Sequence, residues 1–217
     1  MVHRVAISAA RSNPPFGGFG LVLRRPLWIG RWDTVRLVTS SIAPFYRGWA
    51  TYNQAIIDAL RPLAPAQLAL DGGIPEWPIW AIVGHTAGTR PYWLCSVFGE
   101  PGAEATPFPD SANELGWEDD LSHPRGVDEL VGALETTWAI VEGVLERWTP
   151  DMLEAPFRRE IHGKVQFHTR QSVLMRMISH DAYHAGELSQ ILGAAGLVQV
   201  DLWPPQGATG GNVAAGE

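Results

Sequence analysis

The sequence predicts an all-α protein, a four-helix bundle with a long crossover between its second and third helices. Three observations support this: four segments have the apolar spacing of helices, one connection is far longer than a tight turn, and 46% of the 217 residues are apolar. A chain of this length can bury one core. We expect the domain at residues 39–205, between a poorly ordered extension at 1–38 and a disordered tail at 206–217.

The first two helices are expected over residues 41–63 and 78–99. The first opens with a capping candidate, Ser41, and an early proline. The second is less regular, because Gly88 and Pro91 interrupt it, and we expect a kink near Pro91.

The third and fourth helices are expected over residues 127–148 and about 169–193. Apolar residues of the third alternate spacings of four and three, which makes a continuous apolar seam, and Pro150 ends it. Glycines end the fourth. Between them, the segment FRREIHGKVQFHTR is expected to form a short hairpin around Gly163.

Two further features concern the connections. Residues 99–126 contain seven acidic residues and one arginine, so this crossover is expected to be a surface loop or a lid over a site. In the stretches LRPLAPAQL and LERWTPDML, at 60–68 and 145–153, four residues of one match four residues of the other in spacing. Two related helical hairpins would explain that echo, and so would chance.

Composition excludes several classes of function. The net charge of −7 argues against a nucleic-acid partner, which needs a basic face. Cys95 is the only cysteine, so no internal disulfide forms and a cytoplasmic location is expected. No apolar run approaches the roughly 18 residues of a membrane helix, so no membrane partner is expected.

Two histidines lie on the apolar stripe of the fourth helix, where a buried ring needs a partner for each nitrogen. The stripe reads Val173, Met177, His180, His184, Leu188 and Ile191. His180 and His184 are about 40° apart on the helix, and Glu187 shares their face. His85 shares a face with apolar residues of the second helix. Three neutral histidines with open positions left are typical of a catalytic Zn²⁺ site, and Ni²⁺ also fits.

The other candidates are weaker. A histidine pair at this spacing also occurs by chance, with the rings bonded to a tyrosine or a carbonyl. Cys95 lies about 15 Å along the helix from His85, too far to share its metal, and is expected to be a small buried residue. The remaining histidines are expected at the surface, and Asp181 on the flank of its helix. These histidines are His3, His123, His162 and His168.

The motifs GHTAGTRPYWL, HDAYHAGEL and GLVQVDLWPP resemble those of the DinB-like (DinB/YfiT-like) metalloenzyme superfamily, over about residues 40–205. The resemblance implies an up-down-down-up four-helix bundle, a metal held by His85, His180 and His184, and often a homodimer. Some similar proteins are transferases that use a low-molecular-weight thiol such as mycothiol, bacillithiol or glutathione. In such an enzyme the metal lowers the pKa of a bound thiol or water.

The resemblance also gives roles to two further residues. Glu187 would orient a ligand ring or take a proton, and Arg90 would bind a carboxylate of the thiol or substrate. The alternative for Arg90 is a surface ion pair. Aromatic residues near the site would line a pocket or belong to the core. These are Tyr92, Trp93 and Tyr183.

Three functions remain open at this point. The first is a metal-dependent transferase acting on a small-molecule substrate through an activated thiol. The second is a hydrolase that uses metal-activated water. The third is a non-enzymatic, stress-related helical bundle in which the metal is a structural clip.

Overall fold

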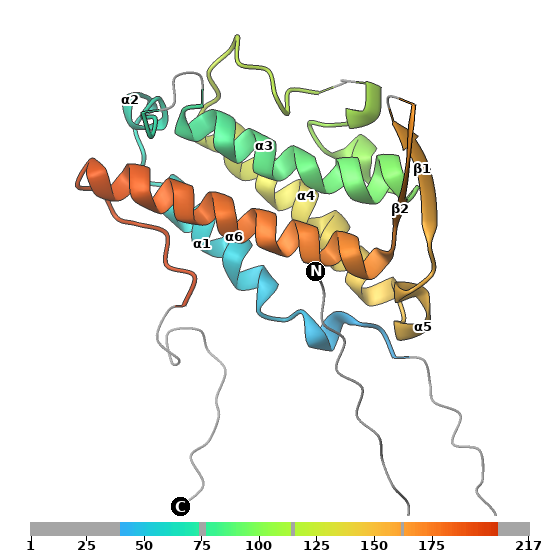
Figure 1. Cartoon of the computed structure of the whole chain (residues 1–217). Coiled ribbons are helices and arrows are strands. Elements are labelled where there is room, and N and C mark those ends of the chain that lie inside the picture. Colours follow the sequence, from blue (N-terminus) through green and yellow to red (C-terminus); the bar gives the residue numbers. More distant parts are fainter. Residues whose placement is uncertain (1–39, 74–76, 114–115, 162, 204–217) are drawn as a thin grey trace, which may run out of the picture. The chain divides into compact units, whose positions relative to one another are not determined.

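The computed structural model describes residues 40–73, 77–113, 116–161 and 163–203, and its fold is mostly helical (Figure 1). Helix α3 (Ile79–Pro91) packs against α4 (Val127–Arg147) and α6 (Arg170–Ala194), and α1 (Trp49–Leu60) packs against the same two helices. The all-α class is thereby confirmed, whereas the up-down-down-up order stays a prediction. The long helices of the described residues are α1, α3, α4 and α6. None of the helices in these ranges is long and apolar enough to cross a membrane.

The predicted third and fourth helices are confirmed nearly to the residue. α4 begins after Gly126, whose amide donates to the carboxylate of Glu129 at 3.0 Å. α6 begins after Thr169, whose hydroxyl accepts from the amide of Ser172 at 3.1 Å. These caps satisfy amides that the first turn of a helix leaves without partners.

The first two helices differ from the prediction at one end each. α1 starts at Trp49 rather than near Ser41, because the segment with Pro44 forms a separate 3-10 turn, η1 (Ala43–Phe45). After Pro91, α3 continues as a π-helix, η2 (Tyr92–Val97), so a change of helix type stands where a kink was expected. Pro91 has no N–H to donate to the preceding turn, which weakens the α-helical pattern there.

The connections carry the short elements. The hairpin is confirmed as antiparallel strands β1 (Phe157–Ile161) and β2 (Lys164–His168), with Gly163 at a φ of 70° in the turn. The two echoing stretches form matching four-residue helices, α2 (Pro65–Leu68) and α5 (Pro150–Leu153). The long connection holds two 3-10 turns, at residues 103–105 and 111–113.

A polar layer divides the core at the same level of all four long helices. Apolar clusters lie on both sides of it, one around Ile56, Ile82 and Leu188 and the other around Trp148 and Val173. The layer takes one buried polar residue from each helix, in the order α1, α3, α4 and α6. These residues are Asn53, Arg90, Thr137 and Asp181.

Candidate metal centre

Three histidines from two helices bring their ring nitrogens together beside the polar layer. His85 comes from α3, and His180 and His184 come from successive turns of α6. The Nε2 atom of His180 lies 3.0 Å from Nε2 of His85 and 3.2 Å from Nε2 of His184. One ligand atom from each ring lies within 4.8 Å of the other two. The three residues that the sequence suggested as ligands are therefore grouped.

The nitrogen positions fit a divalent cation better than they fit hydrogen bonds among the rings. A neutral imidazole has one donor and one acceptor, so three facing Nε2 atoms cannot all be satisfied by one another. Buried Nδ1 of His180 has no partner among the described residues. Separations of 3.0 and 3.2 Å suit two nitrogens that share one ion at about 2.0–2.1 Å.

Carboxylates hold the outward nitrogens of two of the rings. Nδ1 of His184 lies 2.8 Å from a carboxylate oxygen of Glu187, and Nδ1 of His85 lies 3.0 Å from Asp119. Glu118 lies 3.9 Å from the same nitrogen of His85. A carboxylate that accepts the Nδ1 proton leaves the Nε2 lone pair free for a metal, which is how ligand histidines are usually oriented.

The three imidazoles differ in how readily they take up a proton. Burial and the neighbouring rings of His184 and His85 lower the pKa of His180 to about 3. Burial also lowers the pKa of His184, although Glu187 opposes it. Burial alone would lower the pKa of His85, but the hydrogen bond to Asp119 and the charges of Asp119, Glu118 and Glu187 together outweigh it and raise that pKa. His180 and His184 are thus favoured in the neutral form that binds metals.

Two glycines of α3 let the acidic connection reach His85. A Cβ atom added at Gly84 would lie 2.8 Å from the ring of Trp117, and one added at Gly88 would lie 2.5 Å from Glu118. The connection lies against the helix only because both positions lack a side chain. In the sequence, Gly88 looks like an interruption of the helix, and Asp119 was not among the predicted site residues. The sequence feature that indicates a close neighbour of His85 is the pair of glycines four residues apart, Gly84 and Gly88, between which the histidine lies.

An open cavity of about 750 Å³ adjoins the histidines on the side of Glu187. Trp77 and Tyr183 belong to its wall, and each packs edge to face against a ligand ring, His85 at 5.3 Å and His184 at 5.1 Å. Tyr183 is therefore a surface residue beside the site. A small molecule in this cavity would lie beside three residues that contact the ligand rings, Trp77, Tyr183 and Glu187.

Two predictions about charged residues change. Arg90 is fully buried, so the surface ion pair considered for it is wrong. Its guanidinium donates to Asp181 at 3.0 Å and to Asn53 at 2.8 Å, which leaves the expected role in binding a substrate carboxylate without support. Asp181 was expected on the flank of α6 but is buried, and it also accepts from the indole of Trp49 at 2.7 Å.

The other residues named from the sequence are placed as follows. Cys95 is half-buried rather than buried, lies outside the histidine group, and has its pKa raised to about 11, mainly by burial. His123 is exposed as expected, whereas His168 is partly buried. His3 and His162 lie outside the described residues.

Comparison with known proteins shows the family of the chain and agrees with its fold. The sequence profile of the DinB superfamily matches residues 46–188, about two thirds of the chain, and the chain belongs to that superfamily. The fold is similar to the crystal structure of a DinB-like protein from Bacillus cereus, with a TM-score of 0.57 and 19% sequence identity. The similarity covers 76% of this chain and 99% of that one. No curated protein matches the chain.

Proposed function

We propose that this protein is a metal-dependent enzyme, a transferase that activates a low-molecular-weight thiol at the three-histidine centre. The observation that supports it is the convergence of three Nε2 atoms beside an open cavity, with carboxylates on the outward nitrogens of two rings. A closed structural site would use all of its ligand positions, whereas a catalytic site keeps one open.

Each group of the site has a part in this proposal. His85, His180 and His184 would hold Zn²⁺ or Ni²⁺, and the bound metal would lower the pKa of a thiol so that it is a nucleophile at neutral pH. Glu187 keeps the proton of His184 on Nδ1, or accepts a proton from the incoming thiol. Trp77 would form the part of the cavity wall that packs against His85.

Elemental analysis of the purified chain is the first test. We expect about one equivalent of Zn or Ni per chain, and the loss of that metal in His180→Ala. His123→Ala is the matched control, because this ring is exposed and lies outside the histidine group. If neither the parent nor the control holds metal after reconstitution, the histidines are structural and the proposal is wrong.

Thiol dependence then separates the candidate functions. The proposal predicts that the metal-loaded protein binds mycothiol, bacillithiol or glutathione and transfers it to an electrophile. Turnover without thiol would favour the hydrolase. Loss of thermal stability on chelation, with no turnover of either kind, would favour the non-enzymatic bundle. The homodimer, the cytoplasmic location and the link to stress belong to the proposal as predictions, and sedimentation in solution tests the dimer.

A further inference from the structure

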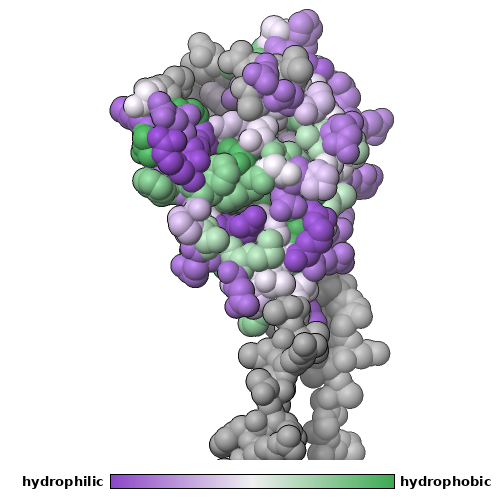
Figure 2. Space-filling model, turned by 90° about the vertical axis from the view of Figure 1, so that its right-hand side faces the viewer, coloured by the Kyte–Doolittle hydropathy of each residue, from purple (hydrophilic) through white to green (hydrophobic). Residues whose placement is uncertain are grey.

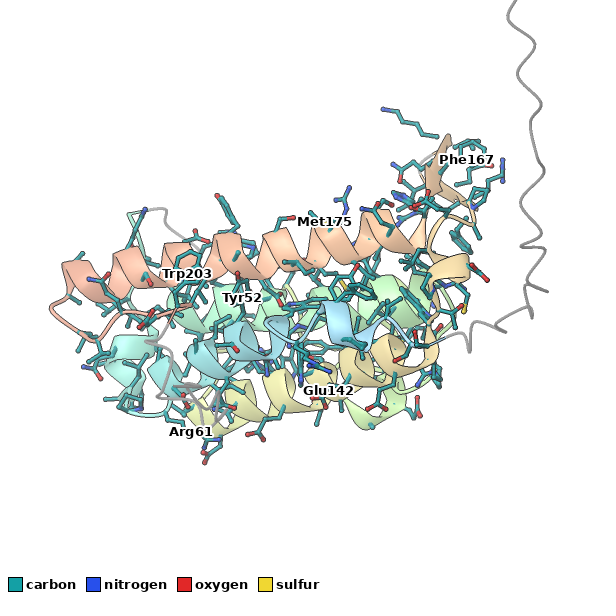
Figure 3. The ribbon with its side chains drawn as sticks, turned by 90° about the horizontal axis from the view of Figure 1, so that it is seen from below. Tyr52, Arg61, Glu142, Phe167, Met175 and Trp203 are labelled. Atoms are coloured by element: carbon teal, nitrogen blue, oxygen red, sulfur yellow. The ribbon has the colours of Figure 1, made fainter. Side chains whose placement is uncertain are left out.

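Strand β2 of the hairpin turns polar side chains inward and apolar side chains to solvent. On β2, Val165 and Phe167 are 47% and 69% exposed, while Gln166 and His168 face inward and are partly buried. Figure 3 shows Phe167 projecting from the hairpin at the end of α6. In β1, Arg159 pairs with Gln166 and is also partly buried. A strand that packs on a core usually shows the opposite alternation, so the inward side chains of β2 do not serve apolar packing.

Three basic side chains from this region surround the indole of Trp93. The Cζ atoms of Arg159 and Arg176 lie 5.1 and 4.9 Å from the centre of a Trp93 ring. The ring of His168 lies edge to face against the same indole at 5.1 Å. Arg159 also donates to the hydroxyl of Tyr92 at 2.7 Å. Both guanidinium groups thus contact the same indole by cation–π interactions, and both are near enough to His168 to lower its pKa.

No carboxylate neutralises these charges within the part of the chain that the structure describes. Neither Arg159 nor Arg176 has an acidic side chain within 4.0 Å, whereas the neighbouring Arg158 pairs with Glu160 at 3.2 Å. Burial first, and then the charges of both arginines, lower the pKa of His168. Cationic groups that gather around one ring without a counter-charge favour the binding of an anion.

The basic cluster of Arg159, Arg176 and His168 adjoins the metal centre on the side of the hairpin. Arg176 precedes His180 by one turn of α6, about 6 Å along the helix, and lies on the same face. Tyr92 follows His85 by two turns along α3 and η2. Figure 1 shows the hairpin against the ends of α3 and α6, and Figure 2 shows the molecule from that side, where polar and apolar surface alternate.

We propose that Arg159 and Arg176, with His168 and the hydroxyl of Tyr92, bind a carboxylate group of the small molecule that acts at the metal centre. The planar fork of each guanidinium matches a carboxylate, and Trp93 holds both forks without neutralising them. The inference deepens the proposed function and rests on it for the ligand, but not for the anion site itself. The substrate or the thiol would therefore be an acid that is long enough to reach from the metal held by His180 to the guanidinium of Arg176.

Binding of hexanoate and of its neutral isostere hexanamide to the metal-free full-length protein tests the anion site. We expect hexanoate to bind about three- to tenfold more tightly, and the preference to fall as salt is raised. The preference should disappear in Arg176→Gln and in Arg159→Gln. It should remain in Arg158→Gln, which removes a cation from the outer face of the same strand. Arg176 is exposed, so its variant should remain folded even if the Arg159 variant does not.

The outcomes separate this inference from the proposed function. Equal binding of hexanoate and hexanamide, or a preference that survives in Arg176→Gln, would overturn the anion site. If the preference is present but mercaptohexanoate binds no better with metal than without it, the anion site stands and thiol activation is wrong. If hexanoate is preferred, if that preference is lost in Arg176→Gln, and if mercaptohexanoate binds more tightly with metal than without it, both the anion site and thiol activation are supported.

Discussion

The ion pair between Arg90 and Asp181 gives the most quantitative prediction. The two side chains are 0% and 1% exposed, and their charged atoms are 3.0 Å apart. Asp181→Asn preserves the size of the side chain but leaves a buried guanidinium without its counter-charge. Loss of one partner of a buried pair costs about 3–5 kcal/mol in the free energy of unfolding. For a domain of this size, that corresponds to a fall of about 10 °C in the melting temperature.

Urea unfolding followed by circular dichroism, with a chelator present, measures this cost without a contribution from metal binding. The matched control is Glu135→Gln, because Glu135 pairs with Arg61 at the same 3.0 Å but both side chains are more than half exposed. We expect the control to cost less than about 1 kcal/mol.

A double-mutant cycle with Arg90→Met isolates the pair itself. The double variant should be less destabilised than the sum of the single variants by about 2 kcal/mol or more, because it leaves neither charge unpaired. A cost below about 1 kcal/mol for Asp181→Asn would refute the reasoning, since it would mean that water reaches the pair.

Three further predictions concern the site and its surroundings. Gly84→Ala should destabilise the protein by about 1–3 kcal/mol, because its Cβ would meet the acidic connection. Gly132→Ala, which has open space in α4, should stabilise it by about 0.5–1 kcal/mol, and thermal melts compare the two. Glu187→Gln should weaken metal binding about tenfold in a competition with a chelator, because His184 loses its charged acceptor. Arg176→Gln should raise the pKa of His168 toward the ordinary value in an NMR titration, since one of the charges that lower this pKa is removed; an unchanged pKa would mean that the two groups do not interact.

Periodicity predicted the elements that are regular in space. The seam of the third helix and the stripe of the fourth repeat at helical spacing, and both helices have the expected bounds within a residue or two. The same stripe identified His180 and His184, because an imidazole at an apolar position is conspicuous. The start of α1 was predicted too early, since a proline near a helix start is compatible both with a first turn and with a separate one.

Contacts between elements distant in the sequence could not be predicted in the same way. Asp119 lies 34 residues from His85, and no periodicity joins a loop residue to a helix. Asp181 follows His180 directly and looked like a flank residue, because its partners Trp49 and Arg90 come from other helices. Its burial depends on those partners rather than on its own position in the stripe.

The polar layer explains why the histidines meet. Arg90 follows His85 by five residues on α3, and Asp181 follows His180 by one residue on α6, so the ion pair joins the two helices that carry the metal ligands. Apolar packing alone tolerates small rotations of a helix, whereas a buried charge pair with 3.0 Å geometry does not. A rotation of α6 that took His180 away from α3 would also separate Asp181 from its guanidinium, at a cost of several kcal/mol. The buried pair therefore fixes the rotation of α6 about its axis, and with it the direction in which both of its histidines point.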